Sequence, residues 1–157
     1  MRQFYRAVLL DDDHRLIGYV EPGAQLEEHA WIGNHGVQGV ERLLSVPARV
    51  VWARREFGRE NLYEVAASVA PLVAPEHGCT GRYIVNHDQC GYVDKAAARE
   101  NARRRRIHPL PILTAEEGTE LHALAGAWAR DRISVSDNVP EGFELWKFDI
   151  AELNQFQ

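Results

Sequence analysis

The chain has 157 residues, of which 45% are hydrophobic and 26% charged, as in an ordinary globular domain. Its net charge of −5 argues against bulk attraction to nucleic acid or anionic membranes and leaves room for a basic partner. No apolar run could span a bilayer and residues 1–6 lack signal-peptide features, so we expect a cytoplasmic protein. Cys79 and Cys90 have neither CxxC nor zinc-finger spacing and fit free thiols.

The first half is predicted to contain a hairpin, a helix, a strand and a second helix. Residues 6–21 form two strand-like runs around consecutive aspartates, which predicts a β-hairpin. Residues 37–44 carry apolar side chains at helical spacing, although neighbouring glycines weaken the start of this helix. Residues 49–53 are β-branched and aromatic and predict a strand. Residues 60–73 predict an amphipathic helix with Asn61 as a cap near its start.

The second half is predicted to begin with another hairpin. Its elements are a hairpin at 81–94, a basic helix at 95–106, an extended segment at 108–111, a helix at 113–128, and strands at 133–136 and 143–150. The basic helix is favoured by its alanines and by terminal arginines that complement the helix dipole. The prolines favour extended backbone before them. Thr114 and Glu117 have the spacing of a capping box.

Short sequences of the first half recur in the second. Arg6 and Arg82 each open an apolar run. The tripeptide Gly-Tyr-Val occurs at 18–20 and 91–93, and Trp-Ala-Arg at 52–54 and 128–130. Two repeats are too few for a solenoid. We therefore predict one α+β domain over 1–157, made of two related hairpin-helix-strand units at about 1–75 and 79–150. The units would form an antiparallel sheet packed against helices, about a pseudo-two-fold axis.

The sequence contains no GxSxG, HExxH, Walker A or GxGxxG signature. Each unit has an Asn-His dipeptide, which could supply a general base or could simply serve a turn. The repeated tryptophans could pack in the core, or line a cleft and stack on a planar ligand with arginines near its phosphate. The candidate ligand-binding residues are Asn34, His35, Trp52, Arg54, Asn86, His87, Trp128, Arg130 and Asp131.

Two charged runs are candidate sites for ions. Residues 11–14 (Asp-Asp-Asp-His) lack the ligand spacing of a calcium loop, so we expect a hairpin turn there, and neither a metal nor a cofactor. Residues 103–106 are four arginines that could bind phosphate groups. A solvated helix end is the favoured interpretation, because no aromatic residues are interleaved and the whole chain is acidic. Nucleic acid is therefore not the expected partner.

Four segments resemble signatures of a group of uncharacterised bacterial and phage proteins. They are 29–34 (HAWIGN), 82–94 (RYIVNH followed by GYVD), 107–114 (IHPLPILT) and 128–137 (WARDRISVSD). Members of that group carry a glycine-rich stretch after the Leu-Thr signature, where this chain has 115–119 (AEEGT). Any role of that stretch is expected to be altered here. The resemblance implies the extent of the fold and no activity.

The leading hypothesis is a non-enzymatic cytoplasmic binding protein. An inhibitor, immunity or sequestering protein would act on a protein partner or on a small nucleotide-like ligand. The alternative is a hydrolase or transferase acting on a nucleotide or ADP-ribose derivative, with His35, His87, Arg130 and Asp131 converging between the two units. A structural subunit is a third hypothesis, and would expose a large apolar patch that pairs two chains.

Overall fold

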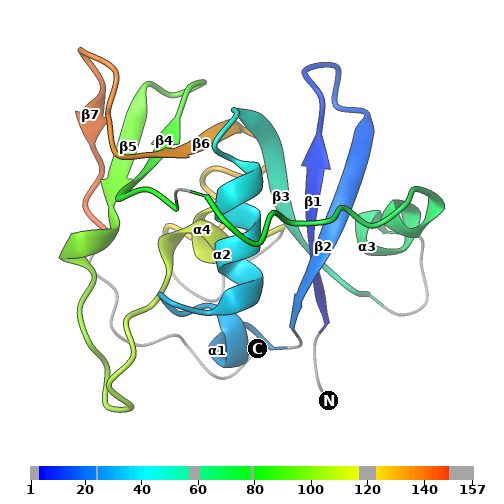
Figure 1. Cartoon of the computed structure of the whole chain (residues 1–157), viewed down its shortest axis with the longest axis horizontal. Helices are drawn as coiled ribbons and strands as arrows, with labels where there is room; N and C mark the ends of the chain where they lie inside the picture. Colours follow the sequence, from blue (N-terminus) through cyan, green and yellow to red (C-terminus); the bar gives the residue numbers. More distant parts are fainter. Residues whose placement is uncertain (1–3, 24, 57–60, 79, 117–122, 149–157) are drawn as a thin grey trace.

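The structure is a computed structural model that describes residues 4–23, 25–56, 61–78, 80–116 and 123–148. Its centre is a seven-stranded sheet in the order β2-β1-β3-β6-β4-β5-β7 (Figure 1). The strands are β1 (Tyr5–Leu10), β2 (Leu16–Gly23), β3 (Ala48–Arg54), β4 (Tyr83–Asn86), β5 (Gly91–Asp94), β6 (Arg132–Ser136) and β7 (Glu144–Leu145). Neighbouring strands are antiparallel except for β5 and β7, which are parallel. The predicted α+β class with a mostly antiparallel sheet is confirmed.

Helices are few and short. They are α1 (Leu26–His29), α2 (His35–Leu43), α3 (Leu62–Val65), α4 (Pro109–Leu113) and the 3-10 helices η1 (Ala66–Ser68) and η2 (Lys95–Ala97). Within the described ranges, no helix combines the length and hydropathy that crossing a membrane requires.

Both predicted hairpins are confirmed, as β1–β2 and β4–β5. The first turns as its sequence predicts, because Oδ1 of Asp11 accepts the backbone N–H groups of Asp13 and Arg15, each at 2.9 Å. The predicted strands at 49–53 and 133–136 are confirmed as β3 and β6.

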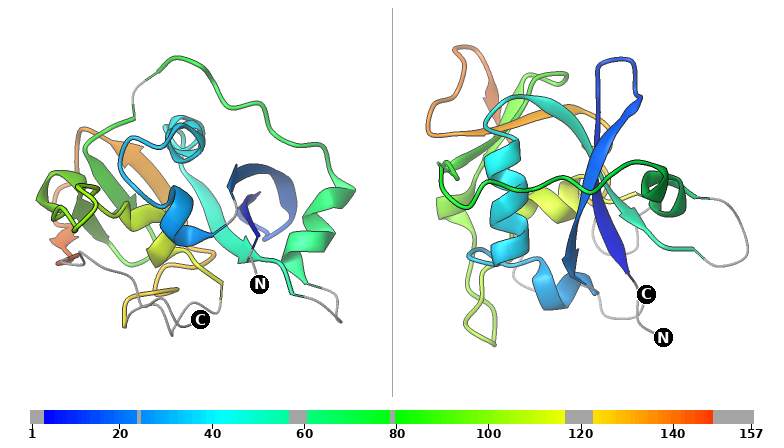
Figure 2. Two further views of the ribbon diagram at one scale, coloured as in Figure 1. Left: turned by 90° about the horizontal axis from the view of Figure 1, so that it is seen from below. Right: turned by 45° about the vertical axis from the view of Figure 1, so that its right-hand side comes forward.

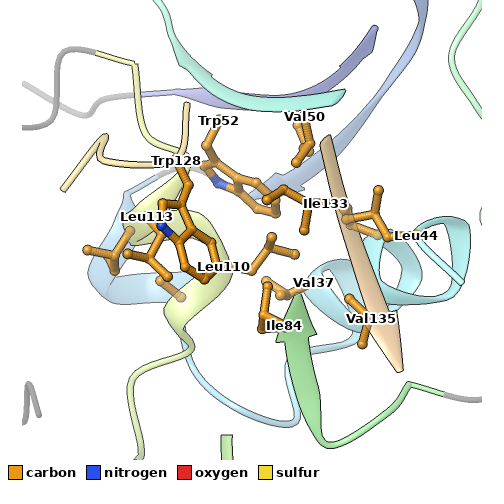
Figure 3. Packing of buried hydrophobic residues seen from close by; sticks show 14 of the residues in the cluster. Val37, Leu44, Val50, Trp52, Ile84, Leu110, Leu113, Trp128, Ile133 and Val135 are labelled. Carbon is orange, nitrogen blue, oxygen red and sulfur yellow. The ribbon is translucent and has the colours of Figure 1, made fainter. Parts of the chain in front are cut away.

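The main core lies between one face of the sheet and the helices α2 and α4. Val37, Val40 and Leu44 of the α2 region are completely buried, so the predicted helical stripe is confirmed. Figure 3 shows Val37 and Leu44 within this core. Gly39 of this helix permits a close approach, because a Cβ there would lie 2.8 Å from the Cβ of Ala74. The glycine therefore accommodates a chain segment that crosses over the helix.

That segment replaces the last part of the helix predicted at 60–73, so this prediction is confirmed over 62–68 and wrong after Ser68. Asn61 caps α3 as predicted, since its Oδ1 accepts the N–H of Glu64 at 3.0 Å. After η1 the chain runs across the molecule toward β4 (Figure 2). The backbone N–H of Leu72 donates to the carbonyl of Tyr19 in β2 at 2.8 Å. Pairing with β2 stabilises an extended backbone that helical periodicity alone does not reveal.

Three predictions in the second half are wrong. Only η2 is helical in 95–106, and the rest is an irregular loop. In the segment 108–111 only His108 is extended, as the residue before the helix, whereas 109–111 open α4 with Pro109 at the first helical position, which proline tolerates. Thr114 ends α4 instead of starting a helix, and its Oγ1 donates to the carbonyl of Leu110 at 2.6 Å.

The described parts of 115–128 contain turns and no helix, and the Glu117 of the expected capping box lies outside the described residues, as does Cys79. The strand predicted at 143–150 is, in its described part, limited to β7. Trp146 and Phe148 nevertheless pack against or within the core.

The strand order reads the same outward from the β3–β6 contact, as β3-β1-β2 and as β6-β4-β5. In each Gly-Tyr-Val tripeptide the tyrosine pairs with a valine of the preceding strand, Tyr19 with Val8 and Tyr92 with Val85. The Trp-Ala-Arg tripeptides do not correspond, because the first belongs to β3 and 128–130 forms a turn before β6. The duplication and its pseudo-two-fold axis are not confirmed by these features.

Candidate functional site

Positive charge is concentrated in one loop between η2 and α4. We call residues 99–107 the arginine hairpin. Glu100 is its one acidic residue. Its five arginines are all exposed: Arg99, Arg103, Arg104, Arg105 and Arg106. In a chain of net charge −5, this loop is a local reversal of sign.

Asn101 shapes the tip of the arginine hairpin. Its Oδ1 accepts the backbone N–H groups of Arg103 at 2.9 Å and Arg105 at 3.0 Å. Its own backbone N–H donates to the carbonyl of Arg105 at 2.8 Å. Arg104 has a φ of 60°, a left-handed conformation that costs a non-glycine residue roughly 1–2 kcal/mol. The asparagine thus offers the backbone a turn in place of the predicted helix.

The rest of the arginine hairpin rests on the segment before α2. Glu100 and Arg106 form an antiparallel bridge, and Ile32 donates its N–H to the carbonyl of Arg106 at 2.8 Å. The guanidinium carbon of Arg105 lies 4.8 Å from the ring centroid of Trp31. The side chains of Arg103, Arg104 and Arg106 make no ion pair with any described residue. The tip is therefore ordered in its backbone while most of its cations face solvent.

Both ends of the loop are fixed by one buried carboxylate. Glu41 of α2 accepts hydrogen bonds from Nζ of Lys95 and, at 2.8 Å, from Nε2 of His108. The three residues are 1%, 9% and 1% exposed, respectively. We call Glu41, Lys95 and His108 the buried triad. Because Lys95 precedes the arginine hairpin and His108 follows it, the triad closes the loop at its base.

The hydrogen bonds of His108 assign its tautomer. Nδ1 accepts the backbone N–H of Leu110 at 3.1 Å, so Nε2 carries the proton donated to Glu41. Burial lowers the pKa of His108, although the Glu41 carboxylate acts in the opposite direction. The imidazole is therefore neutral near pH 7, and the ion pair of the triad is that of Lys95 with Glu41.

Of the candidate residues named from the sequence, Asn86 and Asp131 come into direct contact. Nδ2 of Asn86 donates to Oδ2 of Asp131 at 2.8 Å, and Gln89 donates to the same oxygen at 2.7 Å. Oδ1 of Asn86 accepts the N–H groups of Asp88 and Gln89. These bonds hold the β4–β5 turn against the start of β6, which is a structural role for Asn86.

His87 lies beside this turn, with Nε2 2.7 Å from Oγ of Ser134. Burial, and secondly the nearby Arg132, lower the pKa of His87. His35 is instead an exposed residue at the start of α2, directly after Asn34, which caps that helix. No contact among the described residues joins His35 to His87 or Asp131. The structure thus gathers only part of the set on which the enzyme hypothesis depends.

Trp52 and Trp128 are completely buried and point into the same core (Figure 3). Nε1 of Trp52 donates to Nε2 of His29 at 3.0 Å, and burial lowers the pKa of His29 from 6.5 to about 4. The arginines that follow the tryptophans are engaged elsewhere: Arg54 with Glu56 at 3.5 Å, Arg130 with Glu116 at 3.1 Å. This arrangement supports the core-packing interpretation of both indoles over an exposed stacking platform.

Sequence reasoning missed Glu41, Lys95, Asn101 and His108. A signal for Glu41 was present, because it lies one helical turn from both Val37 and Leu44, on the apolar stripe of α2. Over the described part of the chain, no group of three or more His, Cys, Asp or Glu residues could hold a metal ion. Comparisons with protein-family models, with curated proteins and with solved structures return no match for this chain.

Proposed function

We propose that the chain is a non-enzymatic binding protein whose arginine hairpin docks onto an acidic surface of a protein partner. The observation that carries the proposal is the exposed arginine cluster on a backbone fixed at both ends. Such a loop is ordered before binding, so less conformational entropy is lost when it docks. Arginine is also enriched where interfaces contribute most to affinity.

An acidic protein fits this loop better than a nucleic acid does. Nucleic-acid binding proteins follow a phosphate backbone with a broad basic face. Here five of the chain's 18 basic residues are clustered in one short loop, and the chain as a whole has a net charge of −5. A long, rigid duplex would meet repulsion from the acidic remainder of the chain, whereas a compact acidic patch or a short, flexible acidic peptide would not. An inhibitor, immunity or sequestering protein would use such a patch for recognition.

A test can use two polyanions as probes. Fluorescence anisotropy would compare a short poly-glutamate peptide with duplex DNA at ~50 mM salt, where electrostatic binding is screened less than at physiological salt. We expect poly-glutamate to bind the wild type, and the double variant Arg103→Glu/Arg104→Glu to bind about tenfold more weakly. Arg15→Glu, at an exposed position in the β1–β2 turn, is the matched control and should bind like the wild type. Tighter binding to DNA, or an equal loss in the control, would overturn the proposal.

We also propose that the protein acts in the cytoplasm. Cys90 is a free, exposed thiol, a state that a reducing compartment preserves. Separately, we propose that β1–β3 and β4–β6 derive from a duplication, on the strength of the mirrored strand order and the matching Gly-Tyr-Val register. Superposing β1–β2–β3 on β4–β5–β6 in an experimental structure would test it, with mismatched strand directions as the contradicting result.

A further inference from the structure

A small cavity lies between the η2 region and the C-terminal part of the described chain. Its volume is about 310 Å³, at the lower end of the range for small-molecule sites. It is lined by Asp94, Ala97, Arg99, Leu145, Trp146, Lys147 and Phe148. Most of this lining is apolar, and three charged residues stand among it.

Trp146 forms a fixed wall of the cavity. Its backbone N–H donates to the carbonyl of Tyr92 at 2.7 Å, next to the short β5–β7 pairing. Its indole lies over Gly91, where a Cβ would come within 2.7 Å of Cδ1. It also meets the buried Trp128 edge to face, with ring centroids 5.3 Å apart. The indole that borders a cavity is therefore Trp146, and not the Trp52 or Trp128 that the sequence suggested.

The charges around the cavity favour an anion. Asp94 is neutralised by Arg82, which donates to its two carboxylate oxygens at 2.9 Å and 2.8 Å. Asp94 also accepts the backbone N–H of Ala96 at 2.9 Å. Arg99 and Lys147 are both exposed at the lining and carry positive charge. An aromatic wall with cations beside it is complementary to a planar ring that bears an anionic group.

We infer that this cavity binds a planar aromatic small molecule carrying a phosphate group, of the size class of a nucleoside monophosphate. The ring would pack on Trp146 and the neighbouring apolar side chains, with the phosphate toward Lys147 and Arg99. The inference goes beyond the docking function proposed above and uses a different surface. The two surfaces adjoin at Arg99, where the arginine hairpin begins.

The test is a titration of ¹⁵N-labelled protein with AMP as the probe, followed through the tryptophan indole N–H signals. We expect a saturable shift of the Trp146 signal with a Kd of ~1 mM or tighter, while the signal of the buried Trp52 stays in place. Adenosine and inorganic phosphate, which each lack one half of the probe, should bind more weakly. No saturable shift, or an equal response to phosphate alone, would overturn the inference.

Variants separate this site from the arginine hairpin. Lys147→Glu changes an exposed residue and should weaken AMP binding about tenfold, whereas Lys147→Arg should retain it. Arg104→Glu should leave AMP binding unchanged and weaken only poly-glutamate binding. If AMP binding is lost in Arg104→Glu and kept in Lys147→Glu, the cavity is not the site and the inference fails. That result would leave the proposed role of the arginine hairpin intact.

Discussion

The segment 95–108 has two regions that differ in the burial and pairing of their basic side chains. At its base, Lys95 and His108 are buried and both donate to Glu41. At its tip, Arg103 and Arg104 are exposed and meet no described acidic partner. A buried cation that loses its partner is strongly destabilising, whereas solvated cations contribute little to stability. The comparison indicates that the base contributes to folding stability while the tip does not, so the binding that we propose for the tip can be changed separately from folding.

The largest expected effect is at the base. Glu41→Ala leaves Lys95 buried without its counter-charge and the Nε2–H of His108 without an acceptor. We expect the free energy of unfolding to fall by about 3–5 kcal/mol, measured by urea denaturation. Glu41→Gln keeps an acceptor oxygen and should lose less. A loss below about 1 kcal/mol in Glu41→Ala would show that the triad does not hold the base together.

The second effect is a dependence of stability on pH. Burial lowers the pKa of His108, and lowers the pKa of His29 to about 4. Below pH 6.5 the unfolded chain binds protons that the folded chain does not, so stability should fall as the pH falls from 6.5 toward 4. His29 would contribute a slope of up to about 1.4 kcal/mol per pH unit in this window, and His108 a slope of the same sign below pH 6.5. Urea denaturation of His108→Gln at several pH values should show a shallower slope, and an unchanged slope would contradict the buried neutral assignment.

A smaller loss of stability is expected at Asn101, which lies between the base and the tip. Asn101→Ala removes the oxygen that accepts the N–H groups of Arg103 and Arg105. By analogy with lost helix caps, we expect a loss of about 1 kcal/mol, and faster amide hydrogen exchange confined to the loop. Asn101→Asp retains the acceptor and should behave like the wild type. Unchanged exchange in Asn101→Ala would mean that the side chain does not order the tip.

The smallest effect on stability is expected at the tip itself. Arg103→Glu/Arg104→Glu should change the free energy of unfolding by less than about 0.5 kcal/mol, because neither side chain has a described ion pair or is buried. Thermal and urea denaturation of this variant beside Arg15→Glu would check it. A large loss would show that tip and base are not separable.

Local signals in the sequence sufficed for the aspartate turn of the first hairpin and for the apolar face of α2. They failed where distant contacts decide. Leu72 is extended because it pairs with Tyr19, and no window of sequence around Leu72 contains that information.

For the candidate site residues, the sequence did not show which side chains form local turns and which are buried in the core. The turn at Asn101 was not predicted, because the surrounding residues favour a helix and the turn depends on one side-chain oxygen. Trp52 and Trp128 were noticeable as a repeated pair, yet both are core residues. Trp146 has no partner in the repeat pattern, and reaches its cavity only through the parallel pairing of β7 with β5. The repeated tryptophans are therefore core residues, whereas the arginine hairpin and Trp146, to which we assign binding in our proposals, lie outside the sequence repeats.

The most direct test of the central claim is site-specific photo-crosslinking from the tip in an extract of the source cells. A photoreactive amino acid at the exposed position of Ala102 would report what lies against the arginine hairpin. We predict crosslinks to one acidic protein, lost in Arg103→Glu/Arg104→Glu and retained in Arg15→Glu. Crosslinks to nucleic acid, or to a protein whose capture is unaffected by the tip variant, would contradict the account.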